Sequence, residues 1–227
     1  MIVEFLGITG SGKTYVASQY CHYLEKQGEK YVWPWQELYS KNYIYRNAIK
    51  AYSVAKRLIC APKWCINLIR FLHQEGILRW RDYAVLTFNG IYLNHALNTY
   101  NQCNEFAIFD EGIAQYIWAI HFRNRRKILL EEMAQIRELF KFPNTLYVVT
   151  ASSETILSRM MLRNVRDEIR ERGNVEEEVA NGQTMQHEVA KLFSEQKDVH
   201  VVFIDNEINV SEDDKVKSRF EALFSQG

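Results

Sequence analysis

Five short apolar runs are spread along the chain, and each has the length of a β-strand. They cover Ile2–Leu6, Tyr31–Trp33, Glu105–Gly112, Asn144–Thr150 and Val199–Glu207. Apolar runs of this kind are typical of strands buried on both faces of a parallel sheet. Helical segments lie between them, so the order of elements predicts parallel pairing with right-handed crossovers.

The pattern between the second and third runs is helical over about residues 35–101, with breaks at Pro62 and Gly76. Its clearest helix has apolar residues recurring at intervals of three and four, which form a stripe on one face. The members of this stripe are Tyr83, Leu86, Gly90, Leu93, Leu97 and Tyr100. Glycine weakens a helix, so Gly90 is expected to mark close packing or space for a ligand.

The composition excludes some classes of protein but does not indicate a function. The 227 residues are 47% hydrophobic, and 28 Lys and Arg residues balance 28 Asp and Glu residues. This balance gives no global field that would recruit nucleic acid. The four cysteines form no CxxC pair, and no segment has the length and apolarity of a membrane span. We therefore expect a cytoplasmic protein with reduced thiols and no transmembrane segment.

The sequence GITGSGKT, residues 7–14, fits the P-loop pattern GxxxxGK[ST] and lies between an apolar run and an amphipathic helix. Such a loop points backbone N–H groups at phosphate oxygens, and the helix N-terminus adds to their attraction. Lys13 is expected to reach the β- and γ-phosphates of ATP, and the Thr14 hydroxyl to bind Mg²⁺. The predicted nucleotide contacts in this region are Thr9, Gly10, Ser11, Gly12, Lys13, Thr14 and Tyr15.

Asp110 follows four apolar residues at the carboxyl end of the third run, where open α/β sheets bind ligands. This arrangement resembles a Walker B element, in which the aspartate holds Mg²⁺ through water. Thr14 and Asp110 are therefore the predicted metal residues. The competing interpretation is that Asp110 only caps the helix that follows.

The segment TLYVVTASSETILSRMMLRNVRDEIRERGN resembles the nucleoside and nucleotide monophosphate kinases, especially thymidylate kinase and the deoxynucleoside kinases. In that group a strand, a small polar turn and an arginine-bearing helix lead into a lid. The tail VVFIDNEINVSEDDKVKSRFEALF is similar to the group's last strand, adenine-side loop and closing helix. The resemblance implies a lid over about residues 163–184, a nucleotide contact at Asn206, and a homodimer as one arrangement.

Four arginines of this segment recur at intervals of four, three and four residues and so share one helix face. They are Arg159, Arg163, Arg166 and Arg170. Arg163 and Arg166 are expected to offset charge on the transferring phosphoryl group, and Arg159 to contact the nucleotide. Neighbouring acidic residues leave open a surface face with internal ion pairs. The later NVEEEVANGQT, residues 174–184, is expected to form a flexible lid tip.

A kinase needs a carboxylate beside the acceptor hydroxyl, and two candidates follow strands. Glu111 comes directly after Asp110, and Glu37 lies beyond the second run. The deoxynucleoside kinases have an arginine after the acidic residue at the third strand, whereas this chain has Asp110-Glu111-Gly112. An adjacent Asp-Glu pair is also how many ATPases supply a base that activates water, so an ATPase remains an alternative.

The acceptor side is expected to be built from residues 35–101. Trp35 and Tyr39 are the aromatic candidates for stacking on an acceptor, while Trp33 is assigned to the core. The basic stretch His121–Lys127 fits either a clamp on an anionic acceptor or a solvated linker. The amphipathic stretch Val54–Leu72 is interpreted chiefly as a wall of the acceptor cleft, with contact to a membrane surface as the weaker alternative.

The sequence therefore predicts one P-loop NTPase domain over residues 1–227, in three α/β/α layers, with a five-stranded parallel sheet and a helical lid. Its expected activity is ATP- and Mg²⁺-dependent transfer of the γ-phosphoryl group to a small acceptor of nucleoside, nucleotide or sugar type. The alternative is a P-loop ATPase or nucleotide switch acting on a partner protein.

Overall fold

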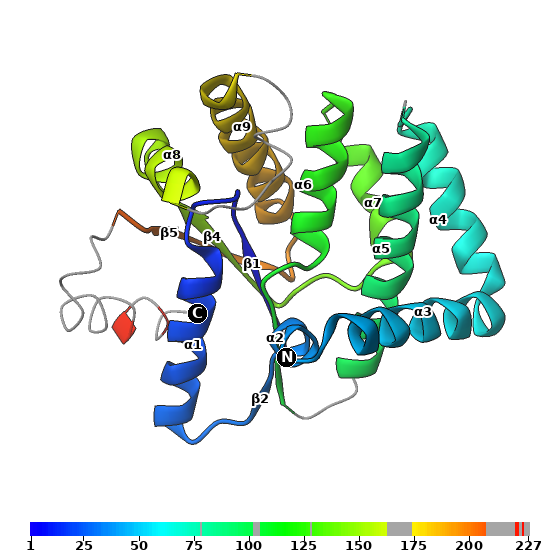
Figure 1. Ribbon diagram of the computed structural model, residues 1–227, viewed down its shortest axis with the longest axis horizontal. Helices are drawn as coiled ribbons and strands as arrows, with labels where there is room; N and C mark the ends of the chain where they lie inside the picture. Colours follow the sequence, from blue (N-terminus) through cyan, green and yellow to red (C-terminus); the bar gives the residue numbers. More distant parts are fainter. Residues whose placement is uncertain are drawn as a thin grey trace.

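The computed structural model describes residues 1–77, 79–101, 105–127, 129–162, 174–207, 221–222 and 224. In this part of the chain, five strands form one sheet in the order β2-β3-β1-β4-β5, and all neighbours are parallel (Figure 1). The strands are β1 (Ile2–Leu6), β2 (Tyr31–Val32), β3 (Phe106–Phe109), β4 (Thr145–Thr150) and β5 (His200–Asp205). The predicted five-stranded parallel sheet is confirmed.

Successive residues of β1 point to opposite faces of the sheet, and both faces are covered. Phe5 lies between Tyr20 of α1 and Tyr147 of β4, with ring centroids 5.9 and 5.1 Å away. Glu4 points the other way, to the start of α6. Because β1 is buried along its whole length, it is the centre of the core.

Helices on both faces complete the three layers. α1 packs on one face of β1, and α6 packs on the other beside α9 (Figure 1). The helices that follow strands or complete these layers are α1 (Lys13–Gln27), α6 (Ile113–Asn124), α7 (Leu130–Leu139), α8 (Ser153–Leu162) and α9 (Val175–Ser194).

The helical region between β2 and β3 contains α2 (Pro34–Tyr39), α3 (Tyr43–Cys60), α4 (Pro62–Gln74) and α5 (Trp80–Tyr100). The predicted breaks are confirmed, because Pro62 begins α4 and Gly76 follows its end with a φ of 70°. Gly90 is a point of close packing: a Cβ there would lie 2.5 Å from the Tyr116 hydroxyl oxygen. That hydroxyl donates to the Leu86 carbonyl at 2.8 Å, which ties α6 to α5.

The flexible lid tip expected over residues 174–184 is wrong, because α9 begins at Val175 and continues to Ser194. Three consecutive glutamates occupy the first turn of α9, where the helix dipole favours negative charge. The Gly182 carbonyl accepts a hydrogen bond from Trp118 Nε1 at 2.9 Å, which fixes α9 on α6. Residues 163–173 of the predicted lid lie outside the described residues.

Among the helices that the structure describes, none combines the length and the apolar character that crossing a membrane requires.

Candidate functional site

The P-loop connects β1 to α1 in the conformation that the motif demands. Gly10 and Gly12 have φ values of 90° and 85°, in the left-handed region that favours glycine. Gly12 then serves as the N-cap of α1, so the free N–H groups of the first turn face the loop. A cavity of about 170 Å³ lies within the loop, lined also by Glu111 and Gln115. The predicted strand–loop–helix context is confirmed.

Two residues from distant elements hold the P-loop in shape. Arg159 of α8 donates to the carbonyl oxygens of Gly10 and Ser11 at 3.4 and 3.3 Å, and to that of Asn206 at 2.9 Å. The Asn206 side-chain amide donates to the Ser11 carbonyl at 2.8 Å. These contacts engage carbonyl oxygens of the loop and do not occupy its N–H groups. A direct nucleotide contact by Arg159 or Asn206 stays a prediction.

Thr14 and Asp110 meet at the carboxyl ends of β1 and β3. The Thr14 hydroxyl donates to Asp110 Oδ2 at 3.3 Å, and Trp33 Nε1 donates to Oδ1 at 3.1 Å. Lys13 Nζ is hydrogen-bonded to the Asp110 backbone carbonyl. A hydroxyl beside a carboxylate is an oxygen donor set of the kind that Mg²⁺ prefers, so these residues fit the predicted metal.

Glu4, rather than Asp110, accepts hydrogen bonds from the free backbone N–H groups at the start of α6. Its Oε1 accepts hydrogen bonds from the backbone N–H groups of Ala114 and Gln115 at 2.6 and 3.1 Å. A Cβ on Gly112 would lie 2.4 Å from the Glu4 carboxyl carbon, so a larger residue there would displace this carboxyl group. The interpretation of Asp110 as a helix cap is therefore wrong. Sequence analysis missed Glu4, although a charged residue inside the apolar run IVEFL was a usable signal.

Burial raises the pKa of Glu4 from its ordinary value of 4.5 to about 8, against the lowering effect of the backbone donors of α6. Its Oε2 is buried and has no hydrogen-bond partner among the described residues, which suits a protonated carboxyl. The native state therefore holds a proton that the unfolded chain releases between these two pH values. Stability from this group is present below about pH 4.5 and is lost as pH rises to about 8.

In Glu4→Gln, the unfolding free energy should no longer decrease over this pH range, because glutamine keeps the acceptor oxygen and cannot ionise. The unfolding free energy of the variant should rise relative to the original chain as pH increases through the window, by on the order of a few kcal/mol. Urea unfolding at a series of pH values measures this, with the exposed Glu29→Gln as the matched control. A parallel pH dependence of Glu4→Gln and the original chain would contradict the assignment.

A second cavity, of about 430 Å³, opens beside the P-loop between α2, α5 and α6. It shares Thr9, Glu111 and Gln115 with the P-loop cavity. The other residues that line it are Trp35, Tyr39, Lys50, Leu86, Asn89, Leu93, Gly112, Tyr116, Trp118, Ala119 and Arg123. This mixture of aromatic walls and a few polar groups is typical of a small-molecule site.

The two carboxylate candidates lie in different places. Glu111 is exposed and lines both cavities, and its carbonyl accepts a hydrogen bond from Trp35 Nε1 at 2.8 Å. Glu37 is exposed on α2 and lines neither cavity. Trp33 is buried, as assigned. Trp35 is also buried, but it lines the larger cavity together with the exposed Tyr39.

Lys50 brings a cation into the larger cavity from α3. Its Nζ lies 5.2, 5.6 and 5.5 Å from the ring centroids of Trp35, Tyr39 and Tyr92. Burial lowers the pKa of this ammonium, while the negative charge of Glu111 raises it. Sequence analysis missed Lys50, since no motif marks a lysine that reaches inward from an exposed helix.

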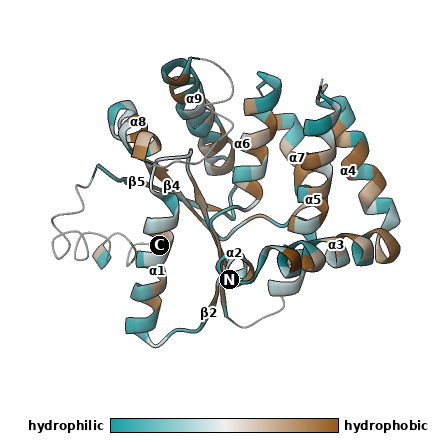
Figure 2. Cartoon of the chain, viewed as in Figure 1, coloured by the Kyte–Doolittle hydropathy of each residue, from teal (hydrophilic) through white to brown (hydrophobic). Residues whose placement is uncertain are grey.

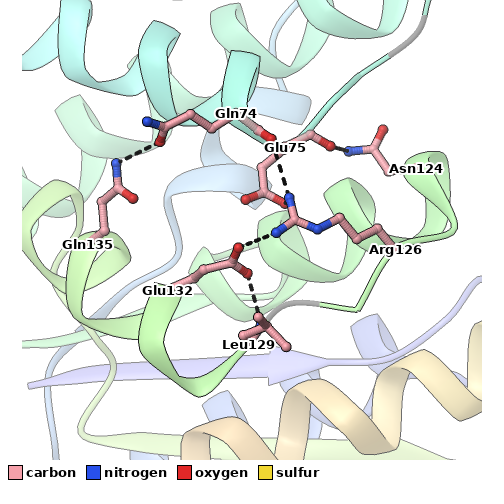
Figure 3. A network of polar contacts seen from close by, with 7 residues as sticks. All are labelled: Gln74, Glu75, Asn124, Arg126, Leu129, Glu132 and Gln135. Atoms are coloured by element: carbon pink, nitrogen blue, oxygen red, sulfur yellow. Dashed lines mark hydrogen bonds and ion pairs between the residues drawn. The ribbon is translucent and has the colours of Figure 1, made fainter.

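Most of the basic stretch His121–Lys127 is engaged with carboxylates of neighbouring helices. Arg126 lies between Glu75 and Glu132, inside a network that joins the end of α4 to the start of α7 (Figure 3). Arg125 pairs with Glu178 and Lys127 with Glu188 on α9. Only Arg123 of this stretch lines the larger cavity, and it lies 3.9 Å from Asp82.

Three predicted site residues remain, namely Tyr15, Arg163 and Arg166. Tyr15 lies in the first turn of α1 and is partly exposed. Arg163 and Arg166 lie outside the described residues, and their roles stay predictions.

Solved structures contain the same arrangement of elements. The chain matches deoxyadenosine kinase from M. mycoides, in the structure with products dCMP and a flexible dCDP bound, with a TM-score of 0.57 and 15% identity. The match covers 100% of this chain and 98% of that chain. Structures of that kinase with dCTP and dATP give TM-scores of 0.46 and 0.45 at 13% and 16% identity, with the same coverage. The first match confirms the expected P-loop kinase-type α/β/α fold.

No protein-family model and no curated protein matches the chain.

Proposed function

We propose that the chain is an ATP- and Mg²⁺-dependent phosphotransferase that acts on a small acceptor. One observation carries this proposal: the P-loop cavity and the larger cavity meet at Thr9, Glu111 and Gln115. A phosphoryl donor held in the loop would therefore lie beside an acceptor held in the larger cavity, and this proximity is what transfer requires.

ATP supplies the phosphoryl group in this proposal, and Mg²⁺ offsets charge on its phosphates. Thr14 and Asp110 have the oxygen atoms to hold the metal, and Lys13 has the ammonium to face the phosphates. Glu111 orients the acceptor hydroxyl and accepts its proton at the junction of the two cavities. Trp35 and Tyr39 give the acceptor flat walls, and Asn89 offers it an amide.

The size of the second cavity favours transfer over simple hydrolysis. Activating one water molecule needs about 30 Å³, whereas the second cavity has about 430 Å³. Its aromatic walls suit a planar or ring-shaped acceptor. Because the matched fold is that of a deoxyadenosine kinase, nucleosides are the first acceptor class to test, followed by nucleoside monophosphates and sugars.

ATP turnover by the purified chain tests the proposal, measured alone and with separate pools of nucleosides, nucleoside monophosphates and sugars. We expect turnover that depends on one pool, with the phosphorylated acceptor as product. Steady hydrolysis at the same rate with and without every pool would instead identify an ATPase.

A further inference from the structure

Helix α3 turns its apolar face to solvent. Ile44, Tyr52 and Ile59 are 80%, 68% and 79% exposed. They share this face with the exposed Ala48, Ala51 and Ala55, at intervals that keep all six on one side of the helix. The helix buries only Ser53 and Val54. A strongly amphipathic helix normally packs its apolar face on the core, so the orientation of α3 needs a reason.

The acceptor cavity does not provide that reason. Lys50 is the one residue of α3 that lines it, and no residue of the stretch Val54–Leu72 does so. This stretch therefore forms no part of the cavity that we propose for the acceptor. In Figure 1, α3 runs along one edge of the molecule, across the ends of α4 and α5, and Figure 2 shows apolar residues along α3 and α4.

The charged residues of α3 and α4 are all basic. Residues 38–74 include no Asp or Glu, although the whole chain is neutral. Lys41, Lys56, Lys63 and Arg70 are exposed, and none forms an ion pair among the described residues. Helices α3 and α4 thus expose apolar and basic side chains and no acidic one, and we call their exposed residues the α3–α4 surface.

We propose that the α3–α4 surface binds an anionic lipid surface, with α3 lying in the plane of the headgroups. An exposed apolar stripe with flanking basic residues is the pattern of an interfacial helix. Tyr43, Tyr45 and Tyr52 are exposed along α3. Tyrosine and tryptophan favour the boundary between water and acyl chains. Anionic headgroups would meet the unpaired lysines and arginine.

A second copy of the chain fits this surface less well. A two-fold interface places the same patch on both subunits, so the basic residues of one copy would face those of the other with no acidic residue to offset them. An anionic lipid surface would attract these basic residues, whereas the same surface of a second copy would repel them.

Vesicle binding by the full chain tests the inference independently of any phosphotransferase activity. Phosphatidylcholine vesicles are compared with vesicles in which phosphatidylglycerol replaces part of the phosphatidylcholine, at low and high salt. We expect binding to the anionic vesicles that weakens with salt. Ile44→Gln/Ile59→Gln and Lys56→Glu/Lys63→Glu should each lower the partition coefficient about tenfold or more.

Matched variants separate these effects from general changes in charge and apolarity. Leu130→Gln/Met161→Gln removes two exposed apolar side chains elsewhere, and Lys30→Glu/Lys197→Glu makes the same change in net charge. Both controls should bind vesicles as the original chain does. Equal binding by the α3 variants, or no preference for anionic vesicles, would overturn the proposal. A dimer that Ile44→Gln/Ile59→Gln dissociates in sedimentation would also overturn it and assign the face to a second copy.

Discussion

Lys13→Ala is expected to lower phosphoryl transfer by about a hundredfold or more, which is the usual cost of removing a positioned charge from developing negative charge. The Lys13 ammonium is fixed beside the sheet through the Asp110 carbonyl, and it lines the P-loop cavity. Its loss removes the one cationic side chain among the described residues that line this cavity. Transfer to the acceptor found in the pool experiment, and ATP binding measured by calorimetry, should both decrease.

The control for Lys13 is Lys26→Ala, which removes an exposed lysine near the end of the same helix. That variant should retain transfer, and circular dichroism should show both variants folded. A folded Lys13→Ala variant with undiminished transfer would refute the assignment of the P-loop as the phosphoryl-donor site.

Glu111→Gln is expected to lower acceptor phosphorylation by about a hundredfold to ten-thousandfold, because glutamine cannot accept the acceptor proton. ATP affinity should change little, since Glu111 meets the P-loop cavity only at its junction with the larger cavity. The substitution should therefore lower the turnover rate and leave ATP binding nearly unchanged. Single-turnover kinetics together with nucleotide titration separate the two quantities.

Glu37→Gln provides the matched comparison, because it is the same chemical change at a carboxylate that lines neither cavity. We expect transfer close to that of the original chain. If Glu37→Gln instead abolished transfer while Glu111→Gln did not, the base would be Glu37. If Glu111→Gln abolished an ATP hydrolysis that needs no acceptor, the chain would be an ATPase.

Glu4 and Gln115 connect the start of α6 to the P-loop through hydrogen bonds. Its carboxyl group accepts from Ala114 and Gln115 at the start of α6, directly after the Asp110–Gly112 turn that carries Glu111. Gln115 in turn accepts a hydrogen bond from the Gly7 N–H at 3.2 Å. Gln115 therefore joins the start of the P-loop to Glu4 and to the start of α6.

The sequence by itself determined the features that depend on neighbouring residues. The five strands, the helix breaks at Pro62 and Gly76, and the P-loop between β1 and α1 are all found where the pattern predicted them. Each rests on local backbone physics: apolar runs need burial, proline cannot continue a helix, and glycine permits left-handed turns.

Only the tertiary structure decided which distant residues and helices become neighbours. Glu111 and Glu37 both follow strands, and only the packing of α2, α5 and α6 brings Glu111 to the junction of two cavities. The acidic run at residues 176–178 predicted a loop, yet the first turn of α9 accommodates it because the helix dipole favours negative charge there. The sequence marked Val54–Leu72 as amphipathic, but periodicity does not say which elements will pack against a helix. That the apolar face of α3 points to solvent follows only from how α4 and α5 pack against its other side.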